Sequence, residues 1–113
     1  MQYFPLFHHM DKRACLIVGG GNVAQRRARS LIAADAEIHL ISKEILPALE
    51  SLLIERGASF EKKAIDLTNL ADDYMLVIAA TNDRAVNLAV ANFAKANRIP
   101  VNVVDDPSAG DFI

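Results

Sequence analysis

The stretch "CLIVGGGNVAQRRAR", residues 15–29, decides the fold, because an apolar run ends at three consecutive glycines and a basic, alanine-rich segment follows. The run from Ala14 to Val18 is almost uninterrupted in its apolar character, which is typical of a strand buried on both faces of a parallel sheet. The segment from Asn22 to Ala34 repeats its apolar residues at helical spacing. The sequence therefore predicts a strand, a glycine-rich turn and a helix in direct succession.

The glycine turn carries the first functional signal. Gly19, Gly21 and Ala24 fit the pattern G-x-G-x-x-[GA] between a predicted strand and a predicted helix, which is the context that a dinucleotide fingerprint requires. In that fingerprint the first glycine makes a tight turn, the second lets backbone N–H groups approach a pyrophosphate, and the third small residue lets the helix pack closely. The positive end of the helix then faces the phosphate. The alternative is a glycine-rich turn that only solves a steric problem.

Length and composition limit what this chain can be. Its 113 residues correspond to one domain, and 52% hydrophobic with 23% charged residues is an ordinary globular composition. The net charge of −2 disfavours nucleic acid or an anionic membrane as the main partner. A single cysteine, no signal-like N-terminus and no run of about 18 apolar residues lead us to expect a cytoplasmic protein.

The rest of the chain continues to alternate between strand-length apolar runs and stretches of helical spacing. Strands are predicted at 37–42, 58–65, 74–80 and 99–104, and helices at 43–56 and 82–97, whereas 66–73 reads as a helical turn or a loop. Two lysines place the strand 58–65 near an edge of the sheet. This order predicts an α/β fold, a Rossmann-like doubly wound parallel five-stranded sheet with flanking helices, whose ligand crevice lies at the carboxyl ends of the strands.

Helical spacing also predicts which side chains face the sheet. The expected inner faces are Val23, Ala24, Ala28, Leu31 and Ile32 in the first helix, Ile45, Leu49, Leu52 and Leu53 in the second, and Ala85, Leu88, Ala89 and Phe93 in the third. The third helix is expected to begin with Asn82 or Asp83 as its N-cap. Cys15 is expected to pack in the first strand as a small apolar residue.

The end of the second predicted strand bears on which dinucleotide binds. NAD enzymes often carry an acidic residue there that hydrogen-bonds the adenosine ribose, and this chain has none at the expected position. Ser42 can hydrogen-bond a ribose, Glu44 can reach it from the next turn, and Lys43 can instead meet a 2′-phosphate. These groups favour NAD over NADP. The alternative is that Lys43 and Glu44 are the solvated first turn of a helix.

Polar residues also follow the fourth and fifth predicted strands, at the same edge as the glycine turn. Thr81 and Asn82 lie where a nicotinamide ribose would bind, although Asn82 has an ordinary alternative role as a helix cap. Asp105 and Asp106 follow the fifth strand, where a catalytic group of an open α/β sheet belongs. Adjacent carboxylates before a proline are also ordinary turn formers.

Several segments together resemble a known family. "YFPLF" at residues 3–7, "LIVGGGNVAQRRAR", "VIAATND" and "PVNVVDDPSAGDFI" occur in the order and spacing of the N-terminal domain of siroheme synthase and the related precorrin-2 dehydrogenases. The resemblance covers nearly the whole chain. It implies an NAD-binding domain that oxidises precorrin-2 to sirohydrochlorin, and in many members of the family ferrous iron is then inserted.

The resemblance also implies roles for individual residues. Asp105 matches an aspartate implicated in catalysis, and we expect it to act as the general base. Asn22 and Val23 match the cofactor contacts after the glycines, and Lys43 and Glu44 match those after the second strand.

The resemblance further implies a homodimer, and it implies that a C-terminal helical region for dimerisation and tetrapyrrole binding is absent from 1–113. An NAD-sensing module and a catalytically inactive cofactor-binding fragment remain alternatives to the dehydrogenase. No metal site is expected, since His8 and His9 are adjacent histidines near a terminus and are typical of surface residues. Arg26, Arg27 and Arg29 either meet the substrate carboxylates or form a solvated helix face.

Overall fold

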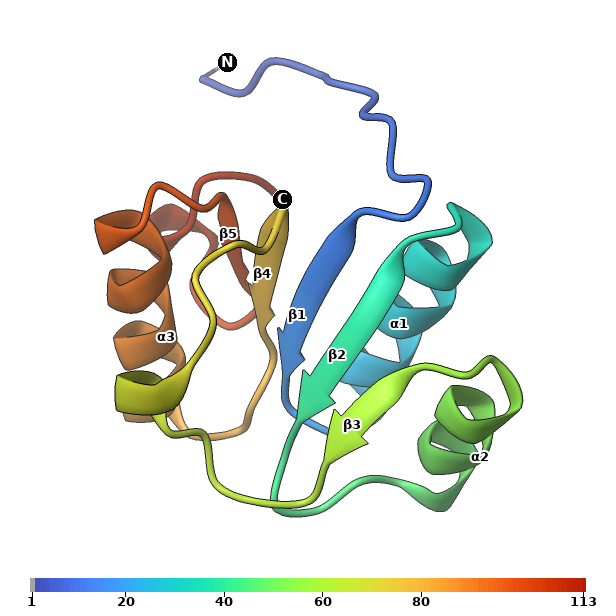
Figure 1. Cartoon of the computed structure of the whole chain (residues 1–113). Coiled ribbons are helices and arrows are strands. Elements are labelled where there is room, and N and C mark those ends of the chain that lie inside the picture. The colour runs from blue at the N-terminus through green and yellow to red at the C-terminus, as the bar shows by residue number, and fades with distance from the viewer. Residues whose placement is uncertain (1) are drawn as a thin grey trace.

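The computed structural model describes residues 2–113, in which five strands form one sheet between helices (Figure 1). The strands are β1 (Ala14–Val18), β2 (Glu37–Ile41), β3 (Ser59–Glu61), β4 (Leu76–Ala79) and β5 (Val101–Val103). The helices are α1 (Asn22–Ala33), α2 (Pro47–Glu55) and α3 (Arg84–Ala96), with short 3₁₀ turns η1 (Leu67–Asn69) and η2 (Pro107–Ala109).

The sheet is parallel throughout, with the strand order β3-β2-β1-β4-β5. The central strand β1 pairs with β2 on one side, Ile17 opposite Leu40, and with β4 on the other, Ile17 opposite Ile78. The direction in which the chain adds strands therefore reverses between β1 and β4. This topology confirms the predicted Rossmann-like fold, and such a reversal is where ligands bind in open α/β sheets, beyond the carboxyl ends of the strands.

Apolar side chains cover both faces of the sheet. Helices α1 and α2 pack on one face, where Ala24, Ala28, Leu49 and Leu53 are buried against Ile17 and its neighbours. Helix α3 packs on the opposite face over β4 and β5 (Figure 1). The predicted inner face of the first helix is confirmed, with Val23, Leu31 and Ile32 partly buried there, and in the second helix Leu52 is partly buried beside Leu49 and Leu53. Ile45, predicted on the same helical face, packs against this core from the loop that precedes α2. Cys15 is fully buried in β1, as expected.

The second helix starts four residues later than predicted. Pro47 occupies its first turn, and the preceding Leu46 is extended with φ −55° and ψ 139°. Proline suits a helix start because it lacks an N–H, and it pushes the residue before it out of helical conformation. Lys43 and Glu44 therefore lie in the loop between β2 and α2, and the interpretation as a first helical turn is wrong.

The predicted inner face of the third helix is wrong by two residues, which at about 100° per residue places it on nearly the opposite side of α3. Ala85, Leu88 and Ala89 are exposed and Phe93 is only partly buried, whereas the buried residues of α3 are Asn87, Val90, Ala91 and Ala94. Both sets have helical spacing, and the prediction chose the set without a polar member. The observed face includes Asn87 because its amide has hydrogen-bond partners in the core, which offset the cost of burying a polar group.

The ends of the sheet differ in character. Residues 2–9 extend from the body at the end where the strands begin, whereas the glycine turn and the β2–α2, β3–η1 and β4–α3 connections gather at the other end (Figure 1). Residues 66–73 contain the single turn η1 and no longer helix. Among residues 2–113, no helix has the length and apolar character needed to cross a membrane.

Candidate cofactor site at the carboxyl edge of the sheet

Two of the three consecutive glycines are required by the protein's own backbone. Gly19 has φ +132°, and a Cβ there would clash with the carbonyl group of Ala80 at the end of β4. A Cβ on Gly20 would clash with the backbone of Glu44 and Ile45 in the loop after β2. These two glycines let three strand ends converge, which is a steric role.

Gly21 differs from its two neighbours. Its φ of −96° is ordinary for any residue, and a Cβ built on it would meet no atom within 4 Å. No steric contact within residues 2–113 therefore explains a glycine at this position. The absent side chain leaves open space at the start of α1, which is what close approach of a phosphate to the backbone requires.

The start of α1 supplies hydrogen-bond donors to that space. Gly21 is the N-cap and has no side chain to accept from the first N–H groups, and the first turn of α1 contains no acidic residue. The N–H of Gln25 makes the first hydrogen bond of the helix, to the Gly21 carbonyl (2.9 Å). The N–H groups of Asn22 and Val23 precede it and therefore have no acceptor within the helix. Uncapped N–H groups and the positive helix end together favour an anion such as a pyrophosphate.

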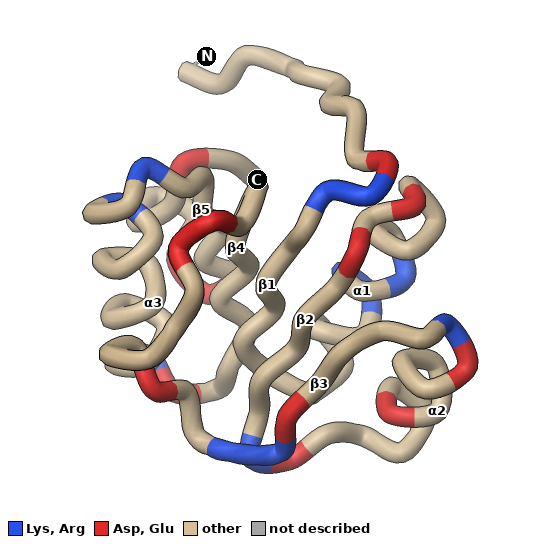
Figure 2. Tube along the Cα trace, viewed as in Figure 1, with Lys and Arg blue, Asp and Glu red and all other residues tan. Residues whose placement is uncertain are grey.

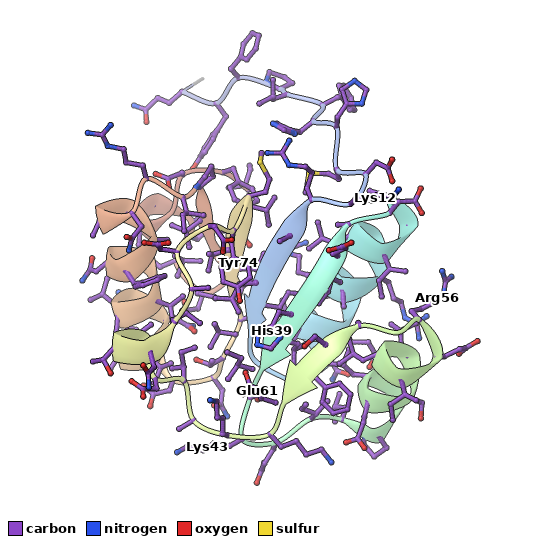
Figure 3. All side chains as sticks on the ribbon, viewed as in Figure 1. Lys12, His39, Lys43, Arg56, Glu61 and Tyr74 are labelled. Atoms are coloured by element: carbon purple, nitrogen blue, oxygen red, sulfur yellow. The ribbon has the colours of Figure 1, made fainter. Side chains whose placement is uncertain are left out.

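The loop after β2 is fixed against the glycine turn. The N–H of Leu46 donates to the Gly20 carbonyl (2.9 Å), and the Ser42 hydroxyl donates to the Glu44 carbonyl (2.7 Å). Lys43 and Glu44 are exposed, and Lys43 lies at the carboxyl edge of the sheet (Figure 3). The structure thus brings the residues predicted to recognise the adenosine half of the cofactor next to the predicted phosphate-binding turn.

The end of β4 forms the other wall of the site. Asp83, and not Asn82, caps α3, since its carboxylate accepts from the N–H groups of Ala85 (2.9 Å) and Val86 (3.3 Å). The alternative role of Asn82 as a helix cap is therefore excluded, and its side chain is exposed. Thr81 is partly buried, and its hydroxyl donates to the Asn87 amide oxygen (2.6 Å).

Asp105 follows β5 at the same edge. Its side chain is exposed, and its Oδ1 accepts a hydrogen bond from Nδ2 of Asn87 (3.1 Å). Asn87 therefore connects the end of β4, through Thr81, to the proposed catalytic carboxylate. The sequence prediction missed Asn87; a polar residue at helical spacing with Val90, Ala91 and Ala94 was the signal that could have found it.

Asp106 has different partners from its neighbour. Its Oδ1 accepts from the Ser108 hydroxyl (2.7 Å), and its Oδ2 lies 3.7 Å from a guanidinium nitrogen of Arg84. It also precedes η2 directly. These contacts fit the turn-forming role for Asp106 and separate it from Asp105, whose side chain is held by α3.

Charges of both signs lie along the edge where β2 and β3 end (Figure 2). Glu61 pairs with Lys63 (3.1 Å) and with Nε2 of His39 (2.8 Å), whose Nδ1 is 2.9 Å from the Ser59 hydroxyl. The hydrogen bonds from Lys63 and then from His39 lower the pKa of Glu61 below its usual value. This edge therefore has no field of a single sign.

The remaining candidate residues lie outside the site. His8 and His9 belong to the exposed segment 2–9, and the described residues contain no group of three or more His, Cys, Asp or Glu side chains placed to hold a metal ion. Arg26, Arg27 and Arg29 are exposed on α1 with no ion pair to another described residue, which is the pattern of a solvated helix face.

The residues present fit a dinucleotide. The open space beside Gly21 leaves room for a phosphate against the backbone. The β2–α2 loop has hydroxyl and charged groups on one side of this space, and Thr81 and Asn82 have polar groups on the other. These three segments lie in the order in which a dinucleotide extends across the carboxyl edge of a doubly wound sheet.

Comparison with known proteins agrees with this geometry. Residues 6–113 match a family model described as "Putative NAD(P)-binding". Siroheme synthase of Saccharophagus degradans is 44% identical over 108 residues, covering 96% of this chain and 23% of that protein. Siroheme synthase of Nitrosomonas eutropha is 43% identical over 113 residues, covering 100% of this chain and 24% of that protein. The chain thus spans about a quarter of the length of the curated relatives it matches.

Solved structures support the same fold. SirC, a precorrin-2 dehydrogenase, aligns with a TM-score of 0.77 at 23% identity, covering 92% of this chain and 50% of that one. GenD2 from gentamicin A biosynthesis, solved in complex with NAD, aligns with a TM-score of 0.63 at 20% identity, covering 89% of this chain and 29% of that one. The family match over residues 6–113, together with the open glycine turn and this fold, establishes that the chain belongs to the NAD(P)-binding family.

Proposed function

We propose that this chain is the cofactor-binding domain, residues 1–113, of an NAD-dependent dehydrogenase that oxidises precorrin-2 to sirohydrochlorin in siroheme biosynthesis. The observation that carries the proposal is the position of Asp105, a carboxylate fixed by one hydrogen bond at the same sheet edge as the vacancy at Gly21. The names of the relatives, siroheme synthase, supply the substrate class.

The proposed cofactor contacts come from three connections. Gly19 and Gly21 shape the turn, and the N–H groups of Asn22 and Val23 hydrogen-bond the pyrophosphate. Ser42 and Glu44 hydrogen-bond the adenosine ribose, and Lys43 lies beside them. Thr81 and Asn82 contact the ribose next to the nicotinamide. The support for this assignment is that the backbone of Gly20 packs against Glu44 and that of Gly19 against Ala80, so these segments form one continuous edge.

Bound at this edge, NAD would supply the hydride acceptor for oxidation of the reduced tetrapyrrole. Asp105 removes the accompanying proton, so that the substrate loses two electrons and two protons in total, and NADH and one free proton result. Its Oδ1 is held by Asn87, which leaves Oδ2 as the oxygen that takes the proton. The exposure of Asp105 lets it reach a substrate and later release the proton to water.

We propose NAD as the preferred cofactor over NADP. Glu44 is exposed next to the ribose-binding position, and its negative charge disfavours a 2′-phosphate. Lys43 has the opposite effect on cofactor preference, because its ammonium group would attract that phosphate. Parallel titrations with NAD and NADP decide the point, and we expect Glu44→Gln to improve NADP binding while leaving NAD binding within about threefold.

The proposal extends to iron insertion and to assembly in a longer protein. Ferrous iron is then a substrate, and Asp105 is the carboxylate at this edge that accepts protons from the pyrrole nitrogens. A homodimer would cover apolar side chains that are exposed here, including Tyr3, Phe4, Leu6 and Phe7. Light scattering and an iron-insertion assay followed by absorbance test these two points separately.

The experiment that tests the main proposal is conversion of enzymatically prepared precorrin-2, with tetrapyrrole absorbance and NADH formation followed together. Asp105→Asn should keep its NAD affinity within about threefold and lose at least a hundredfold in turnover, as expected for removal of a general base. Asp106→Asn is the matched control and should keep most of the activity. An unchanged rate in Asp105→Asn would exclude the role of Asp105, and saturable NAD binding without any conversion would favour a binding module.

A further inference from the structure

Asn87 is the fully buried polar residue of α3, with no exposed surface. It lies in the first turn after the N-cap Asp83, on the face that packs against the ends of β4 and β5. Burial of an amide is costly unless each of its polar atoms is hydrogen-bonded. Its contacts therefore show which arrangement this position of the helix maintains.

Both ends of the Asn87 amide are hydrogen-bonded. Its Oδ1 accepts from the Thr81 N–H (3.0 Å) and from the Thr81 hydroxyl (2.6 Å). Its Nδ2 donates to the Thr81 carbonyl (3.0 Å) and to Oδ1 of Asp105 (3.1 Å). The Thr81 N–H can only donate, and the Thr81 carbonyl and the Asp105 carboxylate can only accept, so a flipped amide would lose these three contacts and could keep only the one to the Thr81 hydroxyl. The orientation of Asn87 is thus fixed by Thr81, and Asn87 in turn holds Asp105.

The hydrogen bond from Asn87 to Asp105 is not needed to attach α3 to the end of β4. The three bonds to Thr81 already satisfy the buried amide oxygen and one amide proton, and they tie α3 to the end of β4. Asp105 is exposed and would be solvated without Asn87. Asn87 is the side-chain donor to Asp105 among residues 2–113, and it leaves Oδ2 of that carboxylate unoccupied by any described residue.

We infer that Asn87 is a positioning residue for the dehydrogenation, an inference that rests on the proposed function of Asp105. Asn87 fixes one carboxylate oxygen of Asp105, so that the other faces the substrate, and it fixes Thr81 at the nicotinamide end of the cofactor site. One buried amide thereby sets the distance between the base and the cofactor-binding strand end. A carboxylate held in place reacts faster than one that samples several rotamers, because its ordering is completed before the reaction.

The test is a double-mutant cycle in the precorrin-2 assay, with Asn87→Ala, Asp105→Ala and the double variant. NAD affinity is measured by titration and the fold by thermal unfolding for each protein. If Asn87 acts through Asp105, Asn87→Ala lowers kcat at least tenfold and leaves the KM for precorrin-2 within about threefold. The double variant then turns over no more slowly than Asp105→Ala alone, because the carboxylate that Asn87 positions is already absent.

Two further variants control for loss of an amide elsewhere in α3 and for unfolding of Asn87→Ala. Asn97→Ala removes an amide from the other end of the same helix, where Nδ2 donates to the Phe93 carbonyl (2.9 Å), and it should leave kcat unchanged. If Asn87→Ala unfolds at the assay temperature, Asn87→Ser replaces it, since its hydroxyl is one bond too short to reach Asp105 and still gives the site a polar group. The same loss and the same non-additivity are expected.

Each outcome decides between the two claims. Two results would overturn the positioning role while the proposed function stands. The first is a double variant whose loss of kcat is the product of the two single losses. The second is a kcat for Asn87→Ala and Asn87→Ser equal to that of the unchanged chain. Full activity of Asp105→Ala would overturn the catalytic assignment and, with it, the inference that rests on it. A loss confined to NAD affinity would mean that Asn87 only holds Thr81 in the cofactor site, and it would overturn the positioning of Asp105 by Asn87.

Discussion

At the scale of the residue, the glycine turn shows that one motif can serve two purposes. Gly19 and Gly20 are glycine because neighbouring backbone occupies the space of a side chain, whereas Gly21 has that space open. The sequence pattern alone treats Gly19 and Gly21 as parts of one fingerprint. Only the position of Ala80 and Glu44, which come from distant parts of the chain, separates the steric role from the binding role.

The steric role of Gly19 predicts a large loss of stability on substitution. Gly19→Ala combines φ +132° with a clash against the Ala80 carbonyl, and backbone cannot yield as a flexible side chain can. Gly57→Ala is the matched control, because Gly57 has φ +67° and no atom within 4 Å of an added Cβ. We expect the control to lose about 1–2 kcal/mol of unfolding free energy and Gly19→Ala to lose more than twice as much. Equal losses in urea unfolding would contradict this account.

Burial makes the single thiol unreactive. Cys15 is fully buried in β1, and burial raises its pKa to about 11. At pH 8 only about one thiol in a thousand is then ionised, and the thiolate is the reactive form. We expect no reaction with a disulfide reagent over minutes in the folded chain and complete reaction in urea. Rapid labelling of the folded chain would show that β1 is accessible.

At the scale of the element, the sequence predicted strands and helices best where the apolar pattern was decisive. Strands β1 and β4 and the inner face of α1 agree closely with expectation, since continuous burial leaves a clear signal. The start of α2 was missed because the pattern extends through residues 43–46, and Pro47 restricts the backbone there. The face of α3 was missed because Asn87 is polar, and its burial depends on partners that only the tertiary structure supplies.

The cap of α3 gives a direct stability prediction. Asp83→Ala removes the acceptor for the N–H groups of Ala85 and Val86, and it should cost about 1 kcal/mol. Asn82→Ala should change the unfolding free energy by less than about 0.5 kcal/mol, because no hydrogen bond of Asn82 lies within the described residues. A larger loss for Asn82→Ala than for Asp83→Ala in urea unfolding would reverse the assignment of the cap.

The pairing of β3 with β2 should depend on pH. Hydrogen bonds from Lys63 and His39 lower the pKa of Glu61, so the folded state favours its ionised form. A carboxyl group with a lowered pKa in the folded state stabilises it above the usual glutamate pKa, and this contribution disappears as the pH falls through the lowered value. Glu61→Gln should therefore melt below the unchanged chain at pH 7 and match it near pH 3. A difference in melting temperature that persists or grows in acid would contradict this.

At the scale of the whole molecule, the parallel topology brings the functional residues together. Residues as distant as Gly21, Glu44, Thr81 and Asp105 meet at one edge because all five strands run in the same direction. The alternation of strands and helices was sufficient to predict this convergence. The hydrogen bonds within the site could not be predicted in this way. Ser42, Asn87 and Asp106 each have several possible partners, and the three-dimensional positions of the side chains decide which hydrogen bond forms.

The measurement that tests the central claim most directly is calorimetric titration of NAD into the unchanged chain and into Gly21→Ala. Since a Cβ on Gly21 meets nothing in the fold, both proteins should melt within about 2 °C of each other, a difference well below 1 kcal/mol. We predict saturable binding at one site in the unchanged chain and at least tenfold weaker binding in Gly21→Ala, about 1.4 kcal/mol. Equal affinities, or no binding of NAD by the unchanged chain, would contradict the assignment of this edge as the cofactor site.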